Sequence, residues 1–188
     1  MTGVQTCALP IFPTAIPDLW IISPDIYSDN RGLFFESYNK KTFEAFHIHH
    51  DFVQDNQSIS NKNVIRGLHF QKPPFAQAKL VRVVFGSALD VAVDIRKNSP
   101  FYGKHVMVKL TANENNMFWI PEGFAHGFVA LENNTVLHYK TTNYYNKQAE
   151  DALLWNDEIL NIPWNISNPI VSEKDAKALS FCEFVSPF

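Results

Sequence analysis

Two neighbouring segments combine imidazole, amide and ammonium groups at the spacing of β-strands. In RGLHFQ (66–71), strand alternation places Arg66 on one face and His69 on the other. In the next segment, QAKLVRV (77–83), Gln77 and Lys79 share one face of the predicted strand. Solvated polar faces would explain either strand alone. Together the two strands predict the polar inner face of a barrel whose mouth admits a small ligand.

A third polar position follows an apolar run. The order P-x-G-x-x-H in 121–126 resembles the second motif of cupins. The resemblance implies that Gly123 makes a tight turn and that His126 faces a barrel interior, and a buried core histidine is the alternative. Metal-binding cupins also carry H-x-H followed by Glu, whereas His69 stands alone and Lys79 follows it. Because an ammonium cannot ligate a metal until it is deprotonated, the sequence predicts no metal and no cofactor, and it favours proton chemistry.

The elements that must position these groups are mostly strands. Short apolar or alternating runs recur about every 8 to 12 residues, at 33–38, 52–59, 64–70, 78–85, 88–95, 105–110, 117–120, 127–131 and 135–141. Only 40–47 and a capping box at 172–175 predict helices. The predicted fold class is therefore all-β, a double-stranded β-helix or jelly roll of the cupin type with a few short helices.

One predicted strand carries two carboxylates. In LDVAVDI (89–95) the aliphatic side chains fall on every second position, and Asp90 and Asp94 share the other face. This pattern predicts a half-buried strand.

Composition sets the broad class. The 188 residues are 46% hydrophobic and 19% charged, which suits one well-buried core and excludes a disordered chain. The net charge of -3 provides no excess of cations, so nucleic acid and membrane surfaces are poor partners. The two cysteines, Cys7 and Cys182, form no disulfide framework or metal spacing. A cytoplasmic location is expected.

The first eleven residues are predicted to lie outside the folded domain. MTGVQTCALPI (1–11) resembles a translated sequencing adapter and contributes no patterned strand. The apolar stretch 7–22 lacks a basic region before it and contains three prolines, so it predicts neither an export signal nor a membrane span. A single domain is expected over 12–188.

The motifs also carry a resemblance that covers about 16–181. The matching segments are DNRG (29–32), FVQDN (52–56), RGLHFQ (66–71), QAKLVRVVFG (77–86), DVAVDIR (90–96), WIPEGFAHGF (119–128), YKTTNYY (139–145), LLWNDE (153–158) and SEKD (172–175). Together they resemble the dTDP-4-dehydrorhamnose 3,5-epimerase family. The resemblance implies a homodimeric isomerase of dTDP-L-rhamnose biosynthesis. It would invert C3 and C5 of dTDP-4-dehydro-6-deoxy-D-glucose through an enolate, giving dTDP-4-dehydro-L-rhamnose.

Inversion beside a ketone requires a base, enolate stabilisation and an acid on the opposite face. His69 suits the base, since an unperturbed imidazole has a pKa of about 6.5. The resemblance makes Asp175 its partner, although a helix-cap role alone would also explain Asp175. Lys79 can stabilise the C4 oxygen of the enolate, and His126 would assist or shape the pocket. Tyr139 is the acid in the family; its alternative is a strand aromatic at the barrel mouth.

The diphosphate of the substrate requires cations. Arg31 and Arg66 offer bidentate guanidinium contacts, and no Gly-rich phosphate loop competes with them. A surface ion pair is the alternative for either arginine alone. The resemblance further implies that Arg31 and Glu36 cross a dimer interface and complete the partner's site.

The thymine end of the substrate is assigned to three residues. Gln54 and Asn56 lie two apart on one strand face and line the nucleotide site in the family, and Tyr144 is expected to stack on the base. The rival functions are a single-centre epimerase, a 3,4-ketoisomerase on a related dTDP-sugar, a metal-dependent cupin oxygenase, and a non-catalytic sugar-nucleotide binding module. The intact set His69, Lys79, Tyr139 and Asp175 favours double epimerisation.

Overall fold

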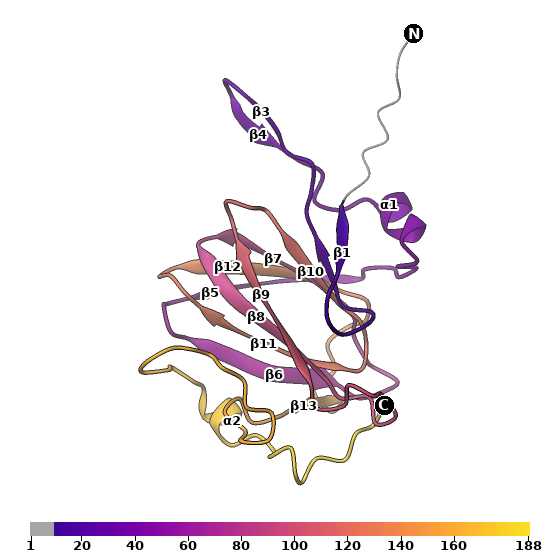
Figure 1. The fold of residues 1–188 in the computed structure, drawn as a ribbon, viewed down its shortest axis with the longest axis vertical. Helices are drawn as coiled ribbons and strands as arrows, with labels where there is room; N and C mark the ends of the chain where they lie inside the picture. The colour runs from indigo at the N-terminus through magenta and orange to yellow at the C-terminus, as the bar shows by residue number, and fades with distance from the viewer. Residues whose placement is uncertain (1–9) are drawn as a thin grey trace.

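Two antiparallel sheets face each other in the computed structural model, which describes residues 10–188 (Figure 1). The six-stranded sheet has the order β1 (Ile11–Pro13), β2 (Trp20–Ile22), β10 (Met117–Ile120), β7 (Lys79–Phe85), β12 (Thr135–Thr141) and β5 (Gln54–Ser60). The five-stranded sheet has the order β13 (Glu150–Ala152), β6 (Ile65–Gln71), β11 (Phe124–Ala130), β8 (Ser87–Asp94) and β9 (His105–Thr111). The predicted all-β jelly roll is confirmed.

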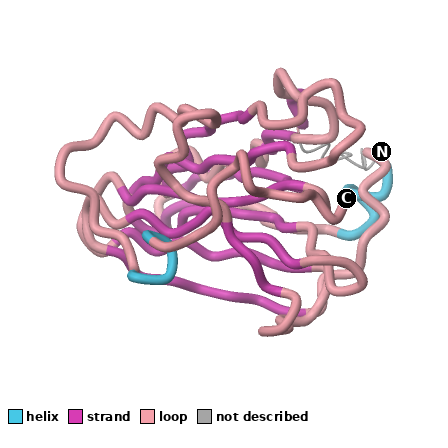
Figure 2. Tube along the Cα trace, turned by 90° about the horizontal axis from the view of Figure 1, so that it is seen from below, coloured by secondary structure: helices cyan, strands magenta, loops and turns pink. Residues whose placement is uncertain are grey.

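A short hairpin and two short helices lie outside the sheets. The hairpin β3 (Tyr27–Asp29) and β4 (Gly32–Phe34) projects away from the body of the molecule (Figure 1). Helices α1 (Lys40–Ala45) and α2 (Glu173–Ala176) lie at the periphery of the strands, as Figure 2 shows. The predicted helix start at Ser172 is confirmed, because the Ser172 hydroxyl accepts a hydrogen bond from the Asp175 amide at 3.1 Å. The reciprocal half of the predicted capping box is not formed, since the Asp175 carboxylate bonds to His69 and Gly67 instead.

Three apolar clusters build the core. The space between the sheets holds large side chains from both, including Phe118, Phe124, Phe128 and Leu137. The outer face of the five-stranded sheet is covered by the C-terminal segment, through Leu153, Leu160, Ile162 and Trp164. Residues from α1 and the loop after it, Phe43 and Ile48, cover part of the six-stranded sheet. Both faces of the five-stranded sheet are therefore buried.

The prediction of a half-buried strand at 89–95 is wrong, because the C-terminal segment covers the outer face of β8. Val91 and Val93 pack outward against the C-terminal segment, while Asp90 and Asp94 point into the space between the sheets. Both aspartates are 0% exposed. Alternation along 89–95 correctly separates the two faces, but it carries no information about a layer supplied by distant residues. The strand is fully buried rather than half-buried.

A bulge between β6 and β11 corrects a second prediction. His126 pairs with His69 and Phe128 pairs with Arg66, so two steps along β11 oppose three along β6. The extra residue turns Arg66 to the same inner face as His69, rather than to the opposite face. Gly67 permits this with a φ of +129°, and a Cβ there would lie 2.5 Å from the Gly127 Cα.

The domain start predicted at residue 12 stays a prediction, and the first described strand begins one residue before it, at Ile11. Ile11 begins β1, pairs with Ile22 and packs against the cluster of Phe43 and Ile48. The prediction for 1–9, including Cys7, lies outside the described residues.

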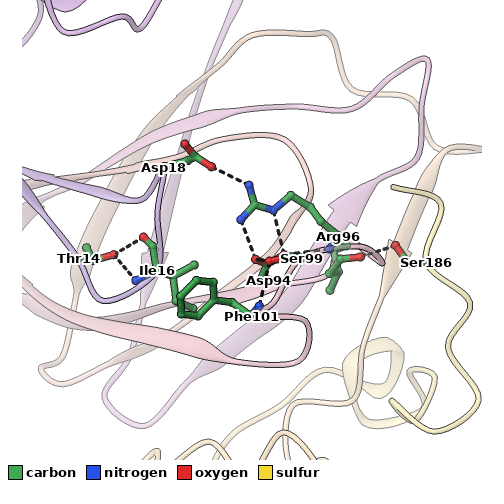
Figure 3. A network of polar contacts seen from close by, with 9 residues as sticks. Thr14, Ile16, Asp18, Asp94, Arg96, Ser99, Phe101 and Ser186 are labelled. Atoms are coloured by element: carbon green, nitrogen blue, oxygen red, sulfur yellow. Dashed lines mark hydrogen bonds and ion pairs between the residues drawn. The ribbon is translucent and has the colours of Figure 1, made fainter.

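A polar cluster ties the N-terminal region to the end of β8. Arg96 lies between Asp18 and Asp94, as Figure 3 shows, with guanidinium-to-carboxylate distances of 2.7 Å to each. Ser99 donates to Asp94 at 2.6 Å, and the guanidinium lies 4.6 Å from the ring centre of Phe124. We call Asp18, Asp94, Arg96 and Ser99 the Arg96 cluster.

Candidate active site

One cavity of about 510 Å³ collects most of the predicted reactive groups. Its lining includes six predicted site residues from β6, β7, β11, β12 and α2, namely Arg66, His69, Lys79, His126, Tyr139 and Asp175. The two sheets and the C-terminal segment thus meet around a single space.

His69 is held by a carboxylate from the distant helix α2. Its Nε2 lies 2.6 Å from Oδ1 of Asp175, whose other oxygen accepts from the Gly67 amide at 3.3 Å. Burial opposes ionisation of Asp175, but hydrogen bonds from His69, Gly67 and Ser172 outweigh it and lower its pKa. The ionised carboxylate therefore fixes the proton on Nε2 and leaves Nδ1 as the basic nitrogen.

Lys79 crosses from the six-stranded sheet toward the five-stranded one. Its Nζ lies 3.5 Å from the carbonyl oxygen of His69 and 6.0 Å from the ring centre of Tyr139. The residue is only 8% exposed. Burial lowers the pKa of Lys79 to about 8, against the opposing attraction of Asp90 and Glu150. The ammonium is therefore largely protonated at neutral pH and loses its charge just above it.

His126 is paired with a carboxylate behind the cavity wall. Its Nε2 lies 2.9 and 3.0 Å from the two carboxylate oxygens of Asp90, and both residues are buried. Burial lowers the pKa of His126, and burial raises the pKa of Asp90. Burial therefore favours the neutral imidazole of His126 and opposes the charge of Asp90, while the hydrogen bond with His126 favours that charge.

Tyr139 shares the inner face of the six-stranded sheet with Lys79. Tyr139 pairs with Val81, and Thr141 pairs with Lys79, so the alternating side chains fall on the same side. Burial, followed by the negative charge of Glu150, raises the pKa of Tyr139. The phenol therefore keeps its proton throughout the neutral range.

Arg66 stands at the cavity with its charge available. Its Nε donates to the Ser60 hydroxyl at 3.2 Å, which orients the guanidinium. Within residues 10–188 no carboxylate lies within 4.0 Å of it, so the surface ion pair is not observed there. An uncommitted guanidinium suits an anionic ligand.

Arg31 and Glu36 are not brought to this cavity. Arg31 is on the projecting hairpin, where its side chain is 86% exposed and pairs with Asp29 at 2.6 Å. Glu36 follows the hairpin and accepts a hydrogen bond from Asn39 at 3.1 Å. Within one chain, these two residues do not complete the site.

The residues assigned to the thymine lie beside the cavity. Gln54 and Asn56 share the inward face of β5 with Ser58, which lines the cavity, and they bond to each other at 2.9 Å. Tyr144 does not line the cavity, whereas Tyr145 does. Stacking of Tyr144 on the thymine stays a prediction, and Tyr145 is a second candidate for it, because β12 ends at Thr141 and no alternation fixes the side of either ring.

A group that the sequence did not single out lies at the same cavity. Glu150 accepts from the Tyr145 hydroxyl at 2.9 Å and from Lys174 Nζ at 2.5 Å. Burial raises the pKa of Glu150, but the bonds from Lys174 and Tyr145 outweigh it and lower the pKa. Glu150 belongs to no recognisable spacing, and the capping-box reading of SEKD left Lys174 without a role.

Residues 10–188 contain no group of three or more His, Cys, Asp or Glu side chains arranged to hold a metal ion. No helix in that part of the chain has the length and apolar character needed to cross a membrane.

Fold and site together define a jelly-roll protein with an oriented imidazole, a buried ammonium and a protonated phenol around one cavity. The family model described as dTDP-4-dehydrorhamnose 3,5-epimerase matches residues 13–183. The Salmonella typhimurium protein of that name is 53% identical over 170 residues, covering 89% of this chain and 93% of that protein.

Solved structures of epimerases are similar to this chain in both sequence and fold. The Elizabethkingia anophelis dTDP-4-dehydrorhamnose 3,5-epimerase is 44% identical with a TM-score of 0.90, covering 93% of this chain and 97% of that one. The Legionella pneumophila dTDP-6-deoxy-D-glucose-3,5-epimerase, in complex with dTDP-4-keto-L-rhamnose, is 43% identical with a TM-score of 0.91, covering 94% and 95%. The chain belongs to the dTDP-4-dehydrorhamnose 3,5-epimerase family and is an enzyme of the isomerase class.

Proposed function

We propose that this enzyme converts dTDP-4-dehydro-6-deoxy-D-glucose to dTDP-4-dehydro-L-rhamnose, in dTDP-L-rhamnose biosynthesis, by inverting C3 and C5. The observation that carries the proposal is the convergence of His69, Lys79 and Tyr139 on one cavity, with His69 oriented by Asp175. Both carbons flank the C4 ketone, so the same three groups serve each inversion in turn.

The base is His69. Nδ1 removes the proton from C3 or C5, and the electron pair of that C–H bond becomes the C=C bond of the enolate. Asp175 stabilises the imidazolium that forms, since its carboxylate already accepts from Nε2 at 2.6 Å.

The enolate oxygen at C4 is stabilised by Lys79. A buried cation acts more strongly there than in water, because little solvent screens it. The charge it opposes develops only during proton removal, so the interaction favours the transition state over the bound ketone.

The acid is Tyr139. Its raised pKa keeps the hydroxyl protonated until the carbanion requires a proton. Delivery to the face opposite His69 inverts the carbon, and the phenolate then recovers a proton from solvent while His69 releases its own.

Binding of the nucleotide requires groups beyond one chain's cavity. Arg66 would contact the diphosphate, and Tyr145 is placed to stack on the thymine, with Gln54 and Asn56 at its polar edge. A homodimer in which the projecting hairpin carries Arg31 and Glu36 to the partner's site would supply the rest.

Subunit complementation tests the homodimer. Mixed Arg31→Ala and His69→Ala proteins should regain part of the activity in hybrid dimers, because one hybrid site keeps both native residues. With subunit exchange shown independently, absence of rescue would place both residues in one chain's site.

No metal or other cofactor is proposed, since each step moves a proton between groups that this chain holds. Full turnover should therefore survive exhaustive chelation. We place the enzyme in the cytoplasm, where a free exposed thiol such as that of Cys182 persists.

The decisive experiment follows substrate protons by NMR in deuterium oxide. Wild-type enzyme should introduce deuterium at both C3 and C5 with inversion. His69→Asn should lose exchange and inversion together, by about 10³-fold. Tyr139→Phe should retain exchange, since His69 still forms the enolate, and should yield little inverted product.

Tyr102→Phe is the matched control, because Tyr102 is a partly buried tyrosine that packs on Phe181 away from the cavity. It should behave as wild type. Label at only one carbon would show a single-centre epimerase, and normal inversion by Tyr139→Phe would make Tyr139 a wall of the pocket.

A further inference from the structure

Lys79 is a buried cation that forms no ion pair with any of the described residues. It is 8% exposed, and within residues 10–188 no carboxylate lies within 4.0 Å of its Nζ. Its contacts are the distant His69 carbonyl, at 3.5 Å, and the face of Tyr139. Buried charges are normally paired, because desolvation otherwise drives them to the neutral form. Something in the barrel must therefore oppose the loss of this proton.

We propose that Asp90 is a positioning residue that keeps Lys79 cationic through the interior field, with His126 holding the Asp90 carboxylate in place. This inference rests on the role proposed above for Lys79 in stabilising the enolate.

Asp90 has the charge and burial that this role requires. It is 0% exposed, and both its oxygens face Nε2 of His126, at 2.9 and 3.0 Å. Burial favours the neutral form of His126, so the pair can supply a net negative charge, and the positive charge of Lys79 in turn lowers the pKa of Asp90. In an interior of low dielectric constant, such a charge acts over several ångströms.

The other carboxylates at the cavity are committed elsewhere. Glu150 also attracts the ammonium, but it lies 2.5 Å from Lys174. Asp175 is hydrogen-bonded to His69. Asp90 is thus the carboxylate near Lys79 that has no cation of its own among the described residues.

The remaining titratable groups around Lys79 do not stabilise its protonated form. His69 and His126, on β6 and β11, and Arg66, at the same cavity, disfavour a further positive charge when they are protonated. Tyr139, on β12, is neutral over the pH range of interest. Asp90 is therefore the group whose removal should most change the charge of Lys79.

The test is a direct titration of Lys79 by NMR in substrate-free protein carrying labelled lysine, with Lys79→Met assigning the signal. Asp90→Asn keeps the shape and a hydrogen-bond acceptor for His126 but removes the charge. The Lys79 titration should move down by about one pH unit. An unmoved titration in a folded variant overturns the proposal.

The pH profile of kcat/KM gives the second measurement. With the Lys79 titration one unit lower, the alkaline limb of Asp90→Asn should shift by the same amount. Activity should match wild type near pH 6, fall about twofold at pH 7, and fall about tenfold above pH 9. A deficit equal at all pH values would mean only a structural role for Asp90, and would overturn the proposal.

The coupling of Asp90 to Lys79 and the role of Lys79 in the reaction can be overturned independently. A shifted Lys79 titration with an unshifted pH profile would support the electrostatic coupling and overturn the proposed role of Lys79 in the reaction. Asp94→Asn is the matched control, since Asp94 lies on the same strand but pairs with Arg96. It should leave both the Lys79 titration and the alkaline limb unchanged.

The reciprocal variant covers the case in which Asp90→Asn does not fold. Coupling between two groups is mutual. Lys79→Met, which replaces the cation by an apolar chain of similar length, should raise the Asp90 carboxyl titration by about one unit. No change would overturn the proposal.

Discussion

Asp90 and Asp94 lie four residues apart on one face of β8, and both are fully buried, yet their surroundings differ. Asp94 receives the Arg96 guanidinium at 3.0 and 2.7 Å and the Ser99 hydroxyl at 2.6 Å. Burial opposes its ionisation, but these bonds outweigh burial and lower its pKa. Within the part of the chain that the structure describes, the Asp90 carboxylate bonds only to the imidazole of His126, and burial raises its pKa.

The difference separates a structural carboxylate from a functional one. A guanidinium neutralises Asp94 within the Arg96 cluster, so its charge stabilises the fold and is not felt elsewhere (Figure 3). A weakly basic imidazole leaves the charge of Asp90 available to Lys79. Two equally buried carboxylates can therefore have different roles, and the group that each one bonds to determines its role.

The largest effect on stability is expected from Gly67→Ala, at the bulge beside His126, the partner of Asp90. The new Cβ would lie 2.5 Å from the Gly127 Cα, at a φ of +129°. We expect a loss of about 3 kcal/mol or more of unfolding free energy and, because His69 shifts, an activity loss of about 10²-fold. Chemical denaturation and the deuterium assay measure these.

Gly32→Ala is the control for backbone strain alone, since Gly32 has a φ of +124° and nothing within 4 Å of a Cβ. Equal destabilisation by the two variants would contradict close packing at the bulge.

The next effect is from Asp94→Asn, which should damage stability and spare chemistry. The amide cannot neutralise Arg96, which then keeps only the more exposed Asp18. We expect a loss of about 2–3 kcal/mol, or about 5–10 °C in Tm, with kcat/KM unchanged at a temperature where the variant is folded. A fall in kcat/KM with an unchanged Tm would reverse the assignment of the two aspartates.

Acid should remove the same stabilisation from wild type. Because the folded pKa of Asp94 is lowered, its contribution is present above the ordinary aspartate value of about 3.9 and is lost as pH falls below it. The Tm difference between wild type and Asp94→Asn should therefore shrink below about pH 4. A difference that persists to pH 2 would show that the charge of Asp94 is not its source.

The smallest effect expected is on the stability of Asp90→Asn. A raised folded pKa means that the folded state binds the proton more tightly, so Asp90 costs stability as pH rises above the ordinary value. Replacing it should change the unfolding free energy by no more than about 1 kcal/mol at pH 7, in the direction of greater stability. A loss of 3 kcal/mol would make Asp90 as structural as Asp94.

Local spacing predicted the strands well. Each of the eight predicted runs from 52 to 141 overlaps a strand, because residues 52–141 alternate or repeat over lengths typical of strands. The prediction for the first run, 33–38, holds only in part. The strand β4 ends at Phe34, and residues 35–38 belong to no strand. Alternation of side chains predicts that a segment is extended, but it does not predict which strand pairs with that segment.

The site was predictable where a motif carried it. His69, Lys79, His126 and Tyr139 came from strand spacing and the family resemblance, and all line one cavity. The side of Arg66 was not predictable, because the bulge depends on two glycines from different strands. Glu150 and Lys174 carried no signal, since their contact joins segments that no local pattern relates.

The bond between His69 and Asp175 joins residues 106 positions apart. Closing a loop of that length costs about 4 kcal/mol of chain entropy, and the loop contains β7 to β13. During synthesis, those strands leave the ribosome before Asp175 does. A growing chain therefore has its imidazole long before the carboxylate that orients it, and catalytic competence comes only with the segment made after the last strand.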